Sequence, residues 1–342
     1  MNEENSIVVK DLKVHFPSRS GLLGKVNGWT KAVDGVSFTV KKGEVFALVG
    51  ESGCGKTTTA QAIMGLLPIT DGSVHLALGP YKDKSISWDD LSNRERKSLR
   101  RHIQIIFQDP YSSLNPRMDV KSILEEPLAI HGFSPKARGE RIDELLDQVG
   151  LSKSYLNRYP HEFSGGQRQR IGIARALATS PELIVADEPV SALDVSIQAQ
   201  IINLLQELQS TYHQTLLFIS HDLAVVHHMA NRVAVMYLGK IVEMGREDQI
   251  FSTPLHPYTS LLLRSVPTVG KKSSVSTTVA TNERDVSNPE NAGCSFYSRC
   301  PRRTDNCRME IPELREFGDG HIAACHNLQS DVECSAPWEM EE

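Results

Sequence analysis

The sequence predicts an α/β domain built on a mostly parallel sheet, with an inserted helical subdomain and a small cysteine-rich C-terminal domain. Short apolar runs alternate with helix-length segments through much of the chain, which is typical of parallel strands joined by crossover helices. One apolar run ends in a glycine-rich loop that opens a helix. The last fifty of the 342 residues hold five of the six cysteines, so the tail differs chemically from the rest.

The expected strands are of two kinds: Val36–Val40 alternates apolar and polar residues like a half-buried strand, and the others are short apolar runs like strands buried on both faces. They are Val36–Val40, Glu44–Val49, Ile103–Phe107, Leu183–Ala186, Leu216–Ile219 and Val233–Tyr237. The expected helices are Lys56–Leu67, Ser122–His131, Arg138–Val149, Gly166–Ala178 and Ile197–Ser210.

The pattern of apolar and polar residues divides the chain into three parts. Residues 1–250 carry the strand and helix alternation, which an almost wholly helical stretch at about 110–180 interrupts. We interpret that stretch as the inserted subdomain. Residues 251–292 are expected to hold a connecting helix and then a polar linker, because 268–292 have little apolar periodicity. Residues 293–342 form the cysteine-rich region.

Composition excludes several classes of protein. Hydrophobic residues make up 40% of the chain and charged residues 23%, which is ordinary for a globular protein. The formal net charge of -5 argues against binding to nucleic acid through bulk positive charge. No apolar run approaches the ~18–20 residues of a membrane span, and the acidic start MNEENSIVVK lacks the order of a signal peptide. We therefore expect a cytosolic chain that reaches a membrane only through a partner.

A phosphate-binding loop follows the second expected strand. Its two glycines, separated by four residues and followed by Lys and Thr, let backbone N–H groups surround phosphate oxygens at the start of a helix. Lys56 supplies a positive charge to the β and γ phosphates, and the Thr57 hydroxyl can bind Mg²⁺. The predicted ATP-binding residues of the loop are Gly50, Glu51, Ser52, Gly53, Cys54, Gly55, Lys56, Thr57 and Thr58.

Two adjacent carboxylates end the apolar run Leu183–Ala186. At the end of a strand the chain turns, so both Asp187 and Glu188 can reach the ligand-bearing edge of the sheet. We assign Asp187 to the Mg²⁺ shell and Glu188 to the activation of the attacking water. Acidic residues also follow strands simply because loops are polar, but the phosphate loop favours the functional interpretation.

A second anion site is predicted where FSGGQ precedes a helix. Ser164 and Gln167 have the spacing of a capping box, yet Gly165 and Gly166 weaken a first helical turn, so capping alone does not explain them. Here the chain resembles the ATP-binding cassette (ABC) ATPases, whose signature is LSGGQ, with Phe163 in place of Leu. The resemblance covers residues 7–250 and implies the RecA-like fold of the P-loop NTPases.

The resemblance assigns further roles. It implies that Gln108 contacts Mg²⁺ and the attacking water, that His221 contacts the γ-phosphate, and that Asp194 belongs to the D-loop. It makes Glu188, His221 and Gln108 the catalytic set, and Thr57, Gln108 and Asp187 the Mg²⁺ ligands. Phe16 is the candidate for stacking on adenine, with Trp29 as the alternative.

The resemblance also implies a working assembly. Each ATP lies between the phosphate loop of one ATPase and the signature turn of a second, related one. Two membrane permease subunits and an external binding protein complete the transporter, with this chain on the cytoplasmic face of the membrane and no nucleic acid bound. The region Pro110–Glu126 is expected to receive the coupling helix of a membrane subunit.

Leu255–Thr259 (LHPYT) and the cysteine-bearing tail make the chain similar to the ATPases of dipeptide and oligopeptide importers. The alternatives are an ATPase of a nickel or metal-chelate importer and a soluble, non-transport ABC ATPase. A purely regulatory nucleotide-binding module is disfavoured by Lys56, Glu188 and His221.

Four cysteines of the tail suit a metal centre, because a small segment that is poor in core residues gains order from a shared ligand. They are Cys294, Cys300, Cys307 and Cys325. Their spacings are not those usual for structural zinc, whereas four thiolates are the ordinary ligands of an iron–sulfur cluster. The resemblance associates this arrangement with a [4Fe-4S] cluster. Zinc and four unligated thiols are the alternatives, and Cys334 lies outside the pattern.

Overall fold

The computed structural model describes residues 5–20, 25–265 and 293–328 of the chain. Their central element is a large sheet with its strands in the order β10-β11-β9-β8-β3-β7-β6-β5. The strands from β8 to β5 run parallel, and β9, β11 and β10 continue the sheet in antiparallel pairs. Their bounds are β3 (Val45–Val49), β5 (Ile103–Ile106), β6 (Leu183–Asp187), β7 (Thr215–Ser220), β8 (Arg232–Tyr237), β9 (Lys240–Arg246), β10 (Arg315–Glu316) and β11 (Ile322–Ala323).

Both faces of the parallel strands are covered, as their continuous apolar runs require. Side chains alternate between the faces, so Val45 and Val49 of β3 lie in one core cluster whereas Phe46 and Leu48 lie in another. The first cluster joins the sheet to the helices, and the second joins it to a smaller antiparallel sheet. That sheet has the order β2-β1-β4, with β1 (Asn5–Ser20), β2 (Lys25–Lys41) and β4 (Asp71–Leu76).

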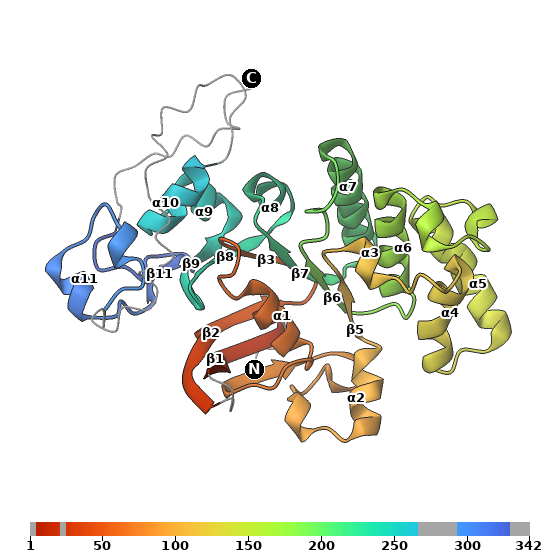
Figure 1. The fold of residues 1–342 in the computed structure, drawn as a ribbon, viewed down its shortest axis with the longest axis horizontal. Helices are drawn as coiled ribbons and strands as arrows, with labels where there is room; N and C mark the ends of the chain where they lie inside the picture. The colour runs from red at the N-terminus through yellow and green to blue at the C-terminus, as the bar shows by residue number, and fades with distance from the viewer. Residues whose placement is uncertain (1–4, 21–24, 266–292, 329–342) are drawn as a thin grey trace.

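The helices begin where the sequence supplies caps. Ser134 caps the helix that starts at Pro135, and Asp119 caps the helix that starts at Val120. Figure 1 shows α3 to α6 gathered beyond β5 at one end of the molecule, and α11 with β11 at the other. The helices are α1 (Lys56–Ile63), α2 (Asn93–Arg100), α3 (Pro110–Ser113), α4 (Val120–Ile130), α5 (Pro135–Gln148), α6 (Gly165–Leu177), α7 (Val195–Tyr212), α8 (Leu223–Met229), α9 (Glu247–Ser252), α10 (Pro257–Arg264) and α11 (Asp305–Met309).

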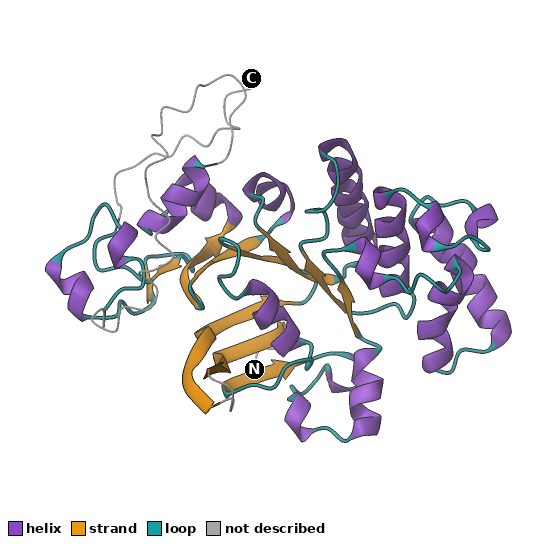
Figure 2. Cartoon of the chain, viewed as in Figure 1, coloured by secondary structure: helices purple, strands orange, loops and turns teal. Residues whose placement is uncertain are grey.

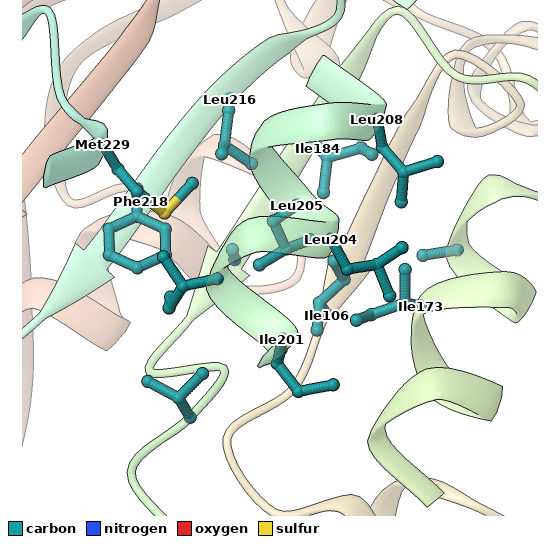
Figure 3. Close-up of a cluster of buried hydrophobic side chains, with 14 of the residues drawn as sticks. Ile106, Ile173, Ile184, Ile201, Leu204, Leu205, Leu208, Leu216, Phe218 and Met229 are labelled. Atoms are coloured by element: carbon teal, nitrogen blue, oxygen red, sulfur yellow. The ribbon is translucent and has the colours of Figure 1, made fainter. Parts of the chain in front are cut away.

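The packing of α7 shows how the helical layer is fixed to the sheet. One face of α7 points its apolar side chains at β6, β7 and α6 (Figure 3). The apolar side chains of α7 recur every three or four residues, which forms the apolar stripe of an amphipathic helix. The labelled residues of this cluster are Ile201, Leu204, Leu205 and Leu208 of α7, Ile173 of α6, Ile184 of β6, and Leu216 and Phe218 of β7.

Every strand and helix that the sequence predicts is present with ends that differ by a few residues, except that Val36–Val40 is only the last part of the longer β2. The strands missing from the prediction are β1, β4, β9, β10 and β11, and the missing helices are α2, α3, α8, α9 and α11. Figure 2 shows the missing strands in the lower sheet and at one end of the main sheet. Among the described helices, none combines the length and the apolar character that crossing a membrane requires.

The described part of the tail is built onto the main domain. Strand β11 pairs with β9, with Ile322 opposite Met244 and Ala323 opposite Glu243. Phe296, only 1% exposed, packs into the same core cluster as β8 and α10. The main domain therefore supplies much of the core that the tail sequence lacks. The expected polar linker, residues 268–292, and Cys334 lie outside the described residues.

Candidate functional site

The predicted phosphate loop connects β3 to α1, at the carboxyl edge of the parallel sheet. Gly55 has φ 108, and a Cβ atom there would lie 2.2 Å from the carbonyl oxygen of Ala32, so only glycine fits. No side chain caps α1, which leaves its first N–H groups for an anion. The buried Lys56 donates from Nζ to the carbonyl oxygens of Gly50 (2.8 Å) and Glu51 (3.0 Å). The loop has the shape and the charge of a phosphate cradle.

Thr57 and Asp187 meet beside this loop. The Thr57 hydroxyl donates to Asp187 Oδ1 over 3.1 Å, and Asp187 is only 6% exposed. Burial raises the pKa of the Asp187 carboxyl, and the neighbouring Glu188 raises that pKa further. A bound cation would offset both effects, and hydroxyl and carboxylate oxygens are the ligands that Mg²⁺ prefers. The two residues thus fit the predicted Mg²⁺ site.

The three predicted catalytic residues come together at the ends of three adjacent strands. Gln108 follows β5, Glu188 follows β6 and His221 follows β7. Glu188 Oε2 lies 3.0 Å from Gln108 Nε2 and 3.0 Å from His221 Nδ1. Both groups contact the same carboxylate oxygen and so orient the Glu188 side chain, an arrangement suited to a general base.

The backbone of Glu188 explains how its side chain reaches that position. Its φ is 46, in the left-handed region that residues other than glycine rarely adopt. Its N–H donates to the carbonyl oxygen of Ile219 over 2.9 Å, and its own carbonyl oxygen accepts from the Ser191 hydroxyl over 3.1 Å. Unfavourable backbone conformations held in place by their surroundings are concentrated at functional sites.

The signature turn starts α6 with a complete capping box. Ser164 Oγ accepts from the N–H of Gln167 over 3.3 Å, and Gln167 Oε1 accepts from the N–H of Ser164 over 3.1 Å. A Cβ on Gly166 would lie 2.5 Å from Cγ2 of Ile197, so this glycine is required for the close packing of α6 on α7. Gly165 lies against Leu193 of the predicted D-loop. The glycines therefore have a packing role besides the anion site that the sequence predicts.

The signature turn and the phosphate loop of this chain are separate. In the described ranges, no hydrogen bond or ion pair joins Ser164–Gln167 to Gly50–Thr58. Asp194 precedes α7 without making a side-chain cap, so its carboxylate is not used in starting the helix.

The two candidates for adenine stacking are neighbours on the antiparallel sheet. Phe16 on β1 is opposite Thr30, and Pro17 is opposite Trp29 on β2. Phe16 is 39% exposed and Trp29 60% exposed, so both rings are available to a ligand. The choice between Phe16 and Trp29 stays a prediction.

The four tail cysteines are free thiols whose charges affect one another. Burial raises the pKa of Cys325 to about 11, and the other three cysteines add to this shift. Nevertheless, the described residues contain no group of three or more His, Cys, Asp or Glu side chains that could hold a metal ion. The predicted metal centre is therefore not confirmed.

Sequence reasoning missed two residues that contact the phosphate loop. The Tyr258 hydroxyl accepts from the N–H of Glu51 over 3.0 Å, and the Arg299 guanidinium binds the Glu51 carboxylate. The sequence signal for Tyr258 was the LHPYT motif, but that motif indicated only the subfamily and not a contact with the phosphate loop. No sequence pattern pointed to Arg299.

Comparison with known families and proteins agrees with this site. Residues 33–191 match the ABC transporter family, and residues 242–307 match the oligopeptide/dipeptide transporter C-terminal region. The oligopeptide transport ATP-binding protein AppF of Bacillus subtilis is 50% identical, over 95% of this chain and 98% of that protein. A putative peptide import ATP-binding protein of Brucella ovis is 46% identical, over 95% of this chain and 98% of its own length.

Solved structures of similar fold are ATP-binding cassettes. One is cbiO1 of Clostridium perfringens, part of an ABC transporter complex, with a TM-score of 0.61 and 27% identity, covering 72% of this chain and 91% of cbiO1. Another is an ATP-binding cassette in a dimeric, post-hydrolysis state bound to ADP and Pi. Its TM-score is 0.60 and its identity 28%, covering 70% of this chain and 98% of that chain.

Proposed function

The chain belongs to the ABC transporter ATP-binding proteins, and on this premise we propose that it hydrolyses ATP to drive the import of peptides through membrane subunits. The observation that carries the proposal is the convergence of Gln108 and His221 on Glu188, beside the phosphate loop. The peptide substrate is supported by the match of residues 242–307 and by the relatives named for peptide transport.

The geometry supports a mechanism for hydrolysis. The N–H groups at the start of α1 and the ammonium group of Lys56 bind the β and γ phosphates. Mg²⁺, held by Thr57, Asp187 and Gln108, would neutralise charge on those phosphates. Glu188 accepts a proton from the attacking water while Gln108 and His221 hold its carboxylate in place. His221, whose side chain is 55% exposed, can turn its other ring nitrogen to the γ-phosphate.

The same site supports a dimer of ATPases as the working unit. The signature turn of Ser164–Gln167 is not bonded to this chain's own phosphate loop, and one solved cassette of similar fold is dimeric with bound nucleotide. We infer that the second ATPase is a related chain. The complete transporter would add two membrane permease subunits and an external binding protein, with this chain peripheral on the cytoplasmic face.

Substrate-stimulated hydrolysis tests the proposed function. In the reconstituted transporter, we expect a peptide-loaded binding protein to raise the ATPase rate several-fold, whereas nickel or a nickel chelate leaves it at the basal rate. Stimulation by nickel alone would assign the chain to a metal importer instead. Hydrolysis that no transport substrate changes, in the presence of all partners, would favour a non-transport ATPase.

We also propose that the four tail cysteines bind a metal centre, with an iron–sulfur cluster favoured over zinc. All four lie in the described 293–328 region. The N–H of Asn327 donates to Cys325 Sγ over 3.4 Å, and Asn327 Nδ2 donates to Cys307 Sγ over 3.5 Å. Donors of this kind favour thiolates and tune metal–sulfur centres. Because no three of these side chains are arranged to hold a metal ion in the described residues, binding would require the thiols to rearrange.

The metal proposal predicts a coloured protein. Anaerobically purified full-length chain is expected to absorb broadly near ~400 nm and to fade in air, as cysteine-ligated iron–sulfur centres do. Changing Cys294, Cys300, Cys307 or Cys325 to Ser should bleach it, whereas the control Cys334→Ser should not. Colourless protein with stoichiometric zinc would support the alternative metal. No metal in an anaerobic preparation of the whole complex would contradict both.

A further inference from the structure

Glu51, the second residue of the phosphate loop, is held at three points. Its N–H donates to the Tyr258 hydroxyl over 3.0 Å, and its carbonyl oxygen accepts from Lys56 Nζ over 3.0 Å. Its carboxylate accepts a hydrogen bond from each Nη atom of Arg299, both over 2.8 Å. Such two-pronged guanidinium–carboxylate pairs restrict geometry as well as adding energy. Glu51 is therefore fixed in backbone and side chain, although its side chain is 42% exposed.

The two groups that hold Glu51 come from the C-terminal part of the chain. Tyr258 lies in the first turn of α10, which the buried His256 caps by accepting from the N–H of Tyr258 over 3.0 Å. Arg299 ends a short 3-10 helix, Tyr297–Arg299, directly before Cys300. Residues 248 positions apart in the sequence thus meet at the nucleotide-binding loop.

A cluster of aromatic rings sets the position of Tyr258 and Arg299. Phe296 packs against Tyr258 at 5.4 Å between ring centroids and against Tyr237 at 5.3 Å. The Arg299 guanidinium lies over the rings of Tyr237 and Phe296, 5.7 Å from each centroid. Tyr258 and Phe296 are at most 1% exposed. Since buried aromatic rings pack with little freedom, this cluster fixes the positions of the Tyr258 hydroxyl and the Arg299 guanidinium.

A fixed loop matters because phosphate binding depends on several N–H groups that must point at one place. Each bond that holds the loop in its binding shape removes part of the ordering cost that ATP would otherwise meet. Glu51 precedes the N–H groups of α1 by only a few residues, and Lys56 is bonded to its carbonyl oxygen. A shift of Glu51 would therefore also displace the ammonium group of Lys56, which binds the phosphates.

We propose that Tyr258 and Arg299 are positioning residues of the ATP site, which tie the C-terminal region to the phosphate loop through Glu51. Neither residue touches the reacting atoms; both act by holding Glu51. The inference rests on the proposed function, because it concerns the same ATP site. It also connects the cysteine-bearing tail to that site, because Phe296 and Arg299 both lie between Cys294 and Cys300 in the sequence.

The test compares ATP binding and turnover in full-length chains assembled with their partners. Arg299→Gln and Tyr258→Phe are each expected to raise KM and Kd for ATP by about three- to tenfold, the range for losing a hydrogen bond to a charged or buried group. The kcat should stay within about twofold, because Glu188, Gln108 and His221 keep their contacts. Arg299→Lys, which keeps the charge, should recover part of the loss.

Matched controls come from the same tail. Arg302→Gln makes the same charge change, but Arg302 donates to the carbonyl oxygen of Leu328 instead of contacting the loop. Tyr297→Phe removes a hydroxyl from the same 3-10 helix. Both controls are expected to match the parent in KM. A purely structural role for Arg299 and Tyr258 predicts a lower melting temperature with unchanged KM, and that result would overturn the proposal.

A double-mutant cycle separates the Glu51 pair from general effects of charge. If Arg299 acts through Glu51, then Glu51→Gln with Arg299→Gln should raise KM no more than the larger single change. Full additivity would contradict the proposal. Failure of the parent to hydrolyse ATP would overturn the proposed function. Normal hydrolysis by the parent, with an unchanged KM in Arg299→Gln and Tyr258→Phe, would overturn only the positioning role.

Discussion

Replacing Glu188 by Gln is expected to reduce steady-state ATP hydrolysis by about a hundredfold or more, the usual cost of losing a general base. The amide cannot take a proton from water. The phosphate loop and the Thr57–Asp187 pair are untouched, so ATP and Mg²⁺ should bind as in the parent. Bound but unhydrolysed ATP should hold two ATPases together, which light scattering would detect as a stable dimer.

The control for this variant is Glu207→Gln, the same change on the exposed face of α7. It should hydrolyse ATP at the parental rate. If Glu188→Gln in the assembled transporter also turned over near that rate, Glu188 would not be the base. The carboxylate that orients the attacking water would then have to be sought elsewhere.

Replacing Ser164 by Arg is expected to abolish hydrolysis and transport in the assembled transporter. The change removes the capping box of α6 and places a bulky cation where a partner's nucleotide would meet the helix start. Because the signature turn is not bonded to the chain's own phosphate loop, the isolated subunit should bind ATP with parental affinity. Equilibrium binding of a fluorescent ATP analogue would measure this.

Ser152→Arg is the matched control, since Ser152 also caps a short helix in the same helical region and is exposed. It should leave hydrolysis and transport intact. Loss of ATP binding by the isolated Ser164→Arg subunit, with normal binding by Ser152→Arg, would contradict the proposal that each ATP is shared between two chains.

The residues at the ends of parallel strands were predictable from the sequence for a physical reason. Each strand is a buried apolar run, and its carboxyl end lies at the same edge as the phosphate loop. Glu188 was predicted from the apolar run that it follows, whereas Gln108 and His221 were assigned through the resemblance to the ABC ATPases. The 3.0 Å contacts then depend on the strand order β7-β6-β5, which the sequence does not state.

The contacts of the tail were beyond sequence reasoning because they join distant segments. Glu243, which is fully buried on β9, accepts from the N–H of His256 over 2.9 Å and pairs with His321 over 2.7 Å. A carboxylate in an apolar strand gives no sign of its partners until the chain is folded. The same is true of Arg299 and Glu51. The tail was therefore predicted as a separate cysteine-rich domain, and its pairing with β9 was not foreseen.

The smaller antiparallel sheet was missed for another reason. Strands β1 and β2 carry polar and charged residues among the apolar ones, and several register shifts interrupt their pairing. Only Val36–Val40 alternates regularly enough to predict a strand. The sheet is stabilised by packing of Val14 and Val36 on the second core cluster, which is a tertiary effect.

Uptake into proteoliposomes tests the central claim most directly. Vesicles that contain the membrane subunits, both ATPases and a peptide-loaded binding protein on the outside should accumulate labelled peptide when ATP is enclosed. Accumulation should stop when the enclosed nucleotide is a non-hydrolysable analogue or when this chain carries Glu188→Gln. Peptide accumulation that is the same without ATP, or none from a complex that hydrolyses ATP in response to another substrate, would contradict peptide import driven by this chain.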